Sequence, residues 1–113
     1  MMLSDYGGLA GVRDENLLES ALARPQQLFA YGKPNMAAMA AAYTAGIVKN
    51  HPFLDGNKRT GFMLGVGLLE RNGFAFHATE ADAALRTLAL AAGEMTEVAF
   101  AKWLQRNSKR KPR

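Results

Sequence analysis

The fold is decided by Met36-Ala-Ala-Met-Ala-Ala-Ala-Tyr-Thr-Ala-Gly-Ile-Val-Lys-Asn50 and the stretch after it, His51-Pro-Phe-Leu-Asp-Gly-Asn-Lys-Arg59. The first stretch is alanine-rich and predicts a buried helix with only small side chains over much of its surface. Pro52 and Gly56 break the helical pattern and predict a loop that begins at His51. Asn57 then opens a second helix, which Gly73 can end in the left-handed conformation. The sequence thus predicts two helices joined by a loop.

Three glycines lie inside the second of these helices. Gly61, Gly65 and Gly67 each cost up to about 1 kcal/mol relative to alanine in a helix interior. Close approach of a neighbouring helix backbone is the simplest compensation. We therefore expect this helix to pack tightly through its glycines.

Helical patterns continue on the N-terminal side of this pair. Asp14 is a good N-cap, and the apolar stripe that follows it stops at Pro25. Two prolines, Gly32 and Asn35 predict a loop over residues 25–35.

The C-terminal side carries two more N-cap signals. Thr79 resembles the first residue of a capping box for a helix that ends at Gly93, and Thr96 caps the last helix. Phe74-Ala75-Phe76 is at most a short extended piece. With no repeat and no convincing strand pair, we predict an all-α fold. It is a compact single-domain helical bundle of about five or six helices, with the loop from His51 between two central helices.

Composition limits the class of protein. At 113 residues, about half of them apolar, the chain is one domain with a single core. The absence of cysteine excludes disulfides, thiolate catalysis and cysteine-based zinc sites. No run of about 18 or more apolar residues predicts a membrane span, and no basic-then-apolar signal segment opens the chain. We therefore expect a cytoplasmic protein.

The net charge of +4 comes from the C-terminal end. Six of the fourteen lysines and arginines lie between Lys102 and Arg113, which leaves eight basic residues against ten acidic residues in the rest of the chain. Broad nucleic-acid binding needs a basic face on the fold itself. We therefore expect no direct binding to nucleic acid, and a basic tail over residues 105–113 that is disordered and solvated.

The chemically informative residues gather in the loop. Gly56 and Asn57 begin a helix whose first N–H groups have no partner inside it, an arrangement that attracts anions. Lys58 and Arg59 add two positive charges at the same end, where they oppose the helix macrodipole unless an anion is bound. The pattern predicts a site for a polyphosphate.

Two further side chains complete a reactive set. Asp55 is the carboxylate of the loop, and beside bound phosphates it would serve as a Mg²⁺ ligand. His51 can accept a hydroxyl proton near neutral pH. A base, a metal ligand, an anion pocket and two cations within nine residues indicate a site for phosphoryl or nucleotidyl transfer.

Simpler interpretations exist for each residue alone. A histidine after a helix is usually a partner of the C-terminal dipole, and a Lys-Arg pair in a helix is usually solvated surface. Their joint occurrence with Gly-Asn and Asp favours function. A Walker P-loop is excluded, because no strand and no glycine-flanked four-residue spacing lead into a Lys-Ser or Lys-Thr pair. Zinc is disfavoured, since His77 is the only other histidine.

The stretch from His51 to Arg59 resembles the signature of the Fic/Doc superfamily, specifically the Doc (death-on-curing) toxin branch of type II toxin–antitoxin systems. Flanking stretches resemble the same branch, so the resemblance covers about residues 8–104. These stretches are Gly11-Val12-Arg13-Asp14, Leu17-Leu18-Glu19-Ser20-Ala21-Leu22-Ala23-Arg24-Pro25-Gln26 and Leu69-Glu70-Arg71-Asn72-Gly73. The resemblance implies a Fic/Doc-type helical domain over residues 1–104, with the family's N-terminal helix short or missing.

Two positions separate the Doc branch from Fic proteins. Fic proteins typically carry glycine at the position of Lys58 and a second arginine at the position of Phe62, and they transfer AMP. Doc proteins are similar in motif but act as protein kinases, with ATP bound in reversed orientation so that the γ-phosphate faces the attacking hydroxyl. The resemblance therefore implies transfer of the γ-phosphate of ATP to a Thr or Ser hydroxyl of a protein.

Carried over position by position, the motif makes His51 the base and Asp55 the Mg²⁺ ligand. The residues that would hold the phosphates are Gly56, Asn57, Lys58, Arg59 and Lys49.

The resemblance also implies partners. Doc toxins phosphorylate elongation factor Tu on a threonine and arrest translation. A small Phd-type antitoxin neutralises them by folding its C-terminal segment as a helix near the active-site cleft. The inhibitory helix of many Fic proteins, of pattern Ser/Thr-x-x-x-Glu-Gly/Asn, has no match in this sequence, so control would come from another chain. Two alternatives remain open: a Fic-type protein adenylyltransferase, which transfers AMP, and a catalytically inactive Fic/Doc-fold binding module.

Overall fold

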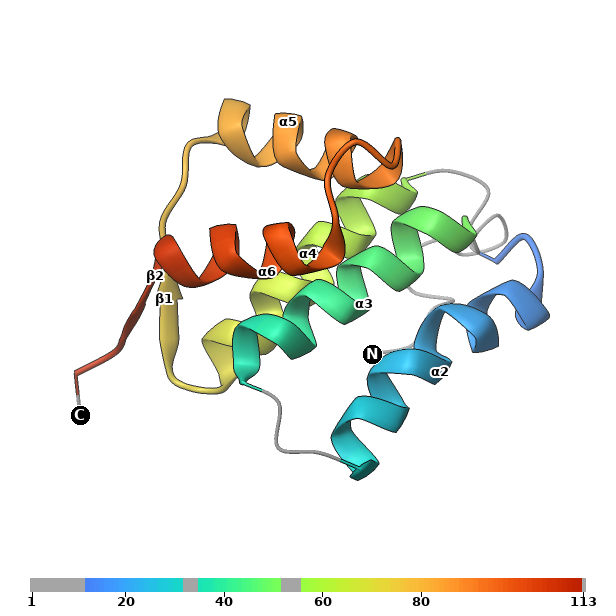
Figure 1. Ribbon diagram of the computed structural model, residues 1–113, viewed down its shortest axis with the longest axis horizontal. Coiled ribbons are helices and arrows are strands. Elements are labelled where there is room, and N and C mark those ends of the chain that lie inside the picture. Colours follow the sequence, from blue (N-terminus) through green and yellow to red (C-terminus); the bar gives the residue numbers. More distant parts are fainter. Residues whose placement is uncertain (1–11, 32–34, 52–55, 113) are drawn as a thin grey trace.

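Helix α3 (Met36–Asn50) lies at the centre of the fold and packs against four other helices. The computed structural model describes residues 12–31, 35–51 and 56–112. Figure 1 shows α3 in the middle of the molecule, with α2 on one side of it and α5 on the other. The elements of the described part, in order, are α2 (Glu15–Tyr31), α3, α4 (Asn57–Arg71), β1 (Phe74–Phe76), α5 (Glu80–Ala91), α6 (Glu97–Arg106) and β2 (Ser108–Arg110). The predicted helical bundle is confirmed for these residues.

Side-chain caps set where three of the helices begin. At α3, the Oδ1 atom of Asn35 accepts a hydrogen bond from the Ala38 N–H at 2.7 Å. Thr79 and Thr96 act in the same way at α5 and α6, where their hydroxyl oxygens lie 3.1 and 3.0 Å from the N–H nitrogen three residues ahead. The N-caps predicted at both threonines are therefore confirmed. After α4, Gly73 has a φ of 92°, which is the left-handed ending that the sequence predicted.

Helix α2 continues past Pro25 to Tyr31, so the loop predicted over 25–35 is wrong for residues 25–31. Pro25 is fully buried. A proline has no N–H to donate to the carbonyl four residues earlier, which here is that of Ala21. That carbonyl lies against the backbone of Gly46 in α3, where an added β-carbon would collide with the Ala21 oxygen. Packing against α3 thus keeps α2 helical through a residue that would end an isolated helix.

The core forms around small side chains on α3 and larger ones on its neighbours. Ala40, Ala41 and Val48 of α3 are fully buried in the main hydrophobic cluster. The larger buried members come from α4, α5 and α6, and they are Leu69, Leu90, Phe100, Trp103 and Leu104. Because alanine side chains are short, several helices approach α3 closely at once.

Two glycines of α4 face α3, as the cost of glycine in a helix predicted. A β-carbon on Gly61 would lie 3.1 Å from the carbonyl oxygen of Thr44, and one on Gly65 would lie 2.9 Å from that of Ala40. The Thr44 hydroxyl also donates a buried hydrogen bond to the Gly61 carbonyl at 2.8 Å. Gly67 has no neighbour within 4 Å of this position, so the expectation was wrong there. The pairings of 44 with 61 and of 40 with 65 show that α3 and α4 run antiparallel.

Strands β1 and β2 pair antiparallel, which corrects the expectation that no strand pair exists. Phe74 lies opposite Arg110, and Phe76 lies opposite Ser108. The tail predicted to be disordered over 105–113 is therefore ordered in this segment, and α6 itself extends to Arg106. Lys111 also donates hydrogen bonds from its main-chain N–H to the carbonyl of Gly73 and from its ammonium group to that of Glu70, at 2.8 and 3.0 Å. The basic tail is held against the end of α4.

In the described part of the chain, no helix combines the length and the apolar character that a membrane crossing requires.

Candidate active site

The loop predicted to carry the chemistry joins the last turn of α3 to the first turn of α4. A β-carbon on Gly61 would lie 3.0 Å from Cγ1 of Val48, so these two positions face one another. His51 lies one turn after Val48, and Asn57 lies one turn before Gly61. The antiparallel register therefore brings the end of α3 and the beginning of α4 to the same end of the helix pair (Figure 1).

His51 ends α3 with both of its backbone groups hydrogen-bonded. Its φ and ψ of 49° and 53° place it in the left-handed region, and it is the only non-glycine residue with positive φ in the described ranges. Its N–H donates to the Ile47 carbonyl at 3.1 Å, and its carbonyl accepts a hydrogen bond from Nε of Arg13 at 3.0 Å. The His51 residue is exposed. A fixed backbone thus presents an accessible imidazole.

The first turn of α4 suits an anion. Gly56 is the N-cap residue, with a φ of 73° in the left-handed region, and it makes no side-chain capping hydrogen bond. Lys58 and Arg59 are exposed in this turn, which contains no acidic residue, while Asn57 is half-buried. The positive end of the helix dipole and two cations therefore coincide, and a bound anion would be stabilised by both.

The remaining predicted residues have different outcomes. Lys49 is exposed in the last turn of α3, where a cation complements the negative end of the helix dipole. Asp55, the predicted Mg²⁺ ligand, lies outside the described residues. Within those residues, no group of three or more His, Asp or Glu side chains comes together as a metal site. The structure therefore brings His51 and Lys49 to the same end as the start of α4.

Phe62 lies in an aromatic cluster. Its ring centroid is 5.8 Å from that of Phe76 and 6.4 Å from that of Trp103. This is the position at which Fic proteins carry a second arginine. In this chain the side chain at that position is half-buried and packs against the main hydrophobic cluster.

Arg13 contacts the main chain of His51, the candidate base, and no individual role was predicted for it. It was part of the Gly-Val-Arg-Asp stretch, where the only local signal is its place immediately before the N-cap residue Asp14. Its partner His51 is 38 residues further along the chain. Such a contact depends on how α2 docks on α3, and no local pattern reports it.

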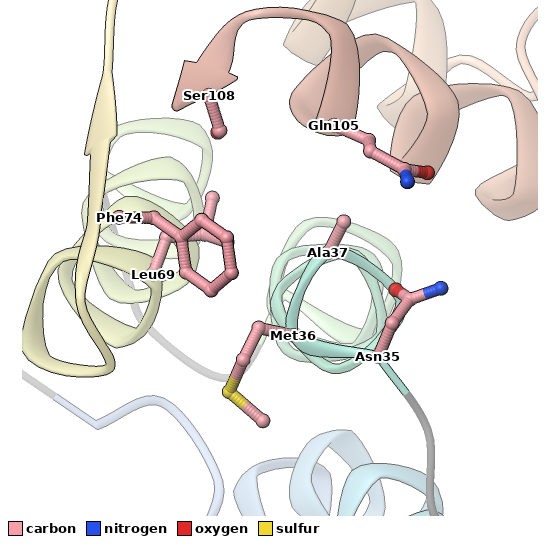
Figure 2. Close-up of a pocket in the computed structure, with 7 residues that line it drawn as sticks. All are labelled: Asn35, Met36, Ala37, Leu69, Phe74, Gln105 and Ser108. Carbon is pink, nitrogen blue, oxygen red and sulfur yellow. The ribbon is translucent and has the colours of Figure 1, made fainter. Parts of the chain in front are cut away.

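A pocket of about 330 Å³ lies at the opposite end of α3 from His51. Figure 2 shows it between the start of α3, the end of α4, β1 and the end of α6. The residues that line it are Asn35, Met36, Ala37, Leu69, Phe74, Gln105 and Ser108. None of them is titratable and none belongs to the predicted site, so the pocket offers no acid, base or charge for catalysis.

Comparison with known proteins agrees with the motif. The family model described as Fic/DOC family matches residues 1–69. Toxin Doc of Mycolicibacterium smegmatis is 41% identical over 71 residues, a match that covers 60% of this chain and 54% of that protein. Protein kinase doc of Escherichia phage P1 is 32% identical over 105 residues, which cover 92% of this chain and 82% of that protein. The chain belongs to the Fic/Doc family, as these matches show together with the motif from His51 to Arg59 and the glycine-packed helix pair.

Proposed function

We propose that the protein is a Doc-type toxin of a type II toxin–antitoxin system that transfers the γ-phosphate of ATP to a Thr or Ser hydroxyl of a protein target. One observation carries the proposal: exposed His51 and the doubly basic first turn of α4 share one end of an antiparallel helix pair. The names of the two relatives, Toxin Doc and Protein kinase doc, support it.

The chemistry follows from this arrangement. His51 accepts the proton of the attacking hydroxyl, whose oxygen forms a bond to the γ-phosphorus as the bond to the bridging oxygen of ADP breaks. The negative charge on the transferred group is stabilised by the N-terminus of α4 with Lys58 and Arg59, and on the other side of the loop by Lys49. Gly56 leaves room for close approach of the phosphates. Asp55 would hold Mg²⁺, which supplies further charge neutralisation when bound.

Two positions favour γ-phosphate transfer over AMP transfer. Lys58 adds a side-chain cation where Fic proteins have glycine, and Phe62 packs with Phe76 and Trp103 where they have arginine. Both differences change which side chains would contact the triphosphate. A Fic-type adenylyltransferase is the alternative activity.

We further propose the biological setting that the family implies. The target would be a translation factor such as elongation factor Tu, in the cytoplasm, and a Phd-like antitoxin would control the toxin through a C-terminal helix at the active-site cleft. A catalytically inactive binding module is the alternative without chemistry. The intact motif from His51 to Arg59 argues against it.

A labelling experiment tests the reaction. The purified protein is incubated with Mg²⁺ and a translation-factor extract, with ATP labelled on either the γ- or the α-phosphate. Label from γ-labelled ATP in a protein band is the expected result. Label that arrives only from α-labelled ATP would replace the kinase with AMP transfer. No label from either, together with no shift of the melting temperature by Mg-ATP, would favour the binding module.

Replacing the base should abolish most of this activity. We expect His51→Ala to lower the rate by roughly 10²- to 10⁴-fold, the usual contribution of a general base. The matched control is His77→Ala, which removes the other histidine of the chain, an exposed residue just after β1. An undiminished rate in His51→Ala would remove His51 from the role of base.

A further inference from the structure

We propose that Arg13 is a positioning residue, which holds the backbone of His51 so that the imidazole stays aimed at the attacking hydroxyl. The inference rests on the role of His51 as the base in the proposed function. Its geometric basis is the hydrogen bond from Nε of Arg13 to the His51 carbonyl at 3.0 Å.

The backbone of His51 needs such support. A left-handed conformation is disfavoured for a residue with a β-carbon, and it persists where surrounding contacts determine it. The bond from the His51 N–H to the Ile47 carbonyl fixes one side of the residue. The hydrogen bond from Arg13 fixes the carbonyl side of the residue. Among the described residues, this bond connects the His51 carbonyl to a part of the chain that is distant in sequence. Together they set the direction of the Cα–Cβ bond and so limit the positions that the ring can reach.

Arg13 is itself held by the beginning of α2. The next residue, Asp14, accepts a hydrogen bond from the Asn16 N–H through Oδ1 at 2.8 Å, and its carbonyl accepts one from the Leu18 N–H at 3.2 Å. The preceding residue, Val12, packs on the small cluster that Ala21 forms with Ile47. The position of Arg13 is therefore fixed by how α2 docks on α3.

The positive charge of Arg13 also favours its position at the end of α3. The carbonyl groups at the end of α3 carry the negative end of its helix dipole, and a guanidinium group there is favourable. Arg13 thus stabilises the end of α3 both as a hydrogen-bond donor and as a cation.

Two substitutions separate these contributions. In Arg13→Gln, the amide nitrogen stands the same number of bonds from the backbone as Nε of arginine, so the donor is kept and the charge is lost. In Arg13→Met, a methyl group takes that place, so both are lost. We expect Arg13→Met to lower kcat roughly tenfold with less than about a twofold change in KM for ATP, because misplacement of a catalytic group affects the transition state more than substrate binding. Arg13→Gln should restore kcat to within about threefold of the wild type.

Histidine NMR tests the contact without any reaction. The chain has two histidines, so the ring signals form two sets, which His51→Ala assigns. The expected result is that Arg13→Met shifts or broadens the His51 signals and leaves those of His77 in place, while Arg13→Gln resembles the wild type.

The outcomes separate this inference from the proposed function. If the wild type transfers no phosphate, the proposed function fails, and the NMR result alone shows whether Arg13 orients His51. An unchanged His51 signal in Arg13→Met overturns the inference, whatever the activity. A changed signal with an unchanged kcat in an active enzyme also overturns it, since the orientation would then have no effect on the reaction.

Discussion

Helices α2, α3 and α4, which position the site, meet through glycine and alanine, whereas β1 and α6 contribute large aromatic side chains to the region that they form with α5 and β2. In the first region, a β-carbon on Gly46 would lie 2.9 Å from the carbonyl carbon of Ala21 and closer still to its oxygen. In the second, the Trp103 ring lies 5.5 Å from Phe76 and 5.3 Å from Phe100, measured between centroids. The first region packs through contacts between backbones, and the second packs through large side chains.

The close backbone packing of the first region bears on the proposed chemistry. Where backbones touch, the helix ends cannot shift without a collision, so His51 and the first turn of α4 are held at fixed separation. In the aromatic region, a charged side chain also joins α5 to α6. Trp103 donates from Nε1 to the Asp82 carboxylate at 2.8 Å, and Arg86 pairs with the same carboxylate at 3.2 Å. We expect added side-chain volume at the backbone contacts to destabilise the first region, and we expect the stability of the second region to depend on charge and pH.

The largest effect should come from adding one methyl group to the backbone contact. Gly46→Ala places a β-carbon against the Ala21 carbonyl, so we expect a loss of about 3 kcal/mol in the free energy of unfolding, the upper range for overpacking. The matched control is Gly67→Ala, which adds the same atom to α4 where no neighbour lies within 4 Å. It should raise stability by about 0.5–1 kcal/mol through helix propensity. Urea denaturation measures both, and effects of the same sign would refute the contrast.

A smaller, pH-dependent effect should follow substitution of Asp82. The hydrogen bond from Trp103, and then that from Arg86, hold the pKa of the Asp82 carboxyl below its usual value. A lowered pKa in the folded state gives stability that is fully present above the unfolded pKa and is lost as pH falls through the folded pKa. Asp82→Asn should therefore melt below the wild type at pH 7, and the gap between their melting temperatures should narrow below about pH 4. A gap that stays constant with pH would exclude an ionic contribution.

The smallest effect concerns two buried threonines, one in each region. Among the described residues, the Thr87 hydroxyl of α5 is buried without a hydrogen-bond partner, whereas that of Thr44 donates to Gly61. Thr87→Val removes an unsatisfied polar group and should be neutral or stabilising by up to about 1 kcal/mol. Thr44→Val removes a used hydrogen bond and should cost about 1 kcal/mol. Chemical denaturation of the two variants should give opposite signs, and a destabilised Thr87→Val would show that its hydroxyl has a partner.

The site-bearing helix pair was predictable because its signals are local. Alanine runs, breaking residues and the left-handed ending at Gly73 place the two helices correctly. The cost of glycine in a helix correctly indicated close packing at Gly61 and Gly65. The motif itself identifies the end of the pair where the chemistry would lie, while the role of Asp55 stays a prediction.

What the sequence did not predict depends on contacts between distant residues. Pro25 remains helical where α2 packs on α3, with the Ala21 carbonyl, to which a proline can donate no N–H, against Gly46. Strand β2 forms because Phe74–Phe76 offers it a partner more than thirty residues earlier. Three residues of Ser-Lys-Arg carry no strand pattern of their own. Arg13 likewise acquires its partner only when α2 docks.

The alanine-rich surface of α3 has a consequence for how the gene can change. Every single-base replacement in an alanine codon that alters the amino acid gives Gly, Val, Ser, Thr, Pro, Asp or Glu. Glycine weakens a helix, and each of the others adds atoms at alanine positions of α3 that are buried against neighbouring helices. Nearly every missense change in these codons would therefore lower the stability of the folded protein. We expect α3, which contributes Lys49 alone to the predicted site, to be among the segments of the gene that drift least.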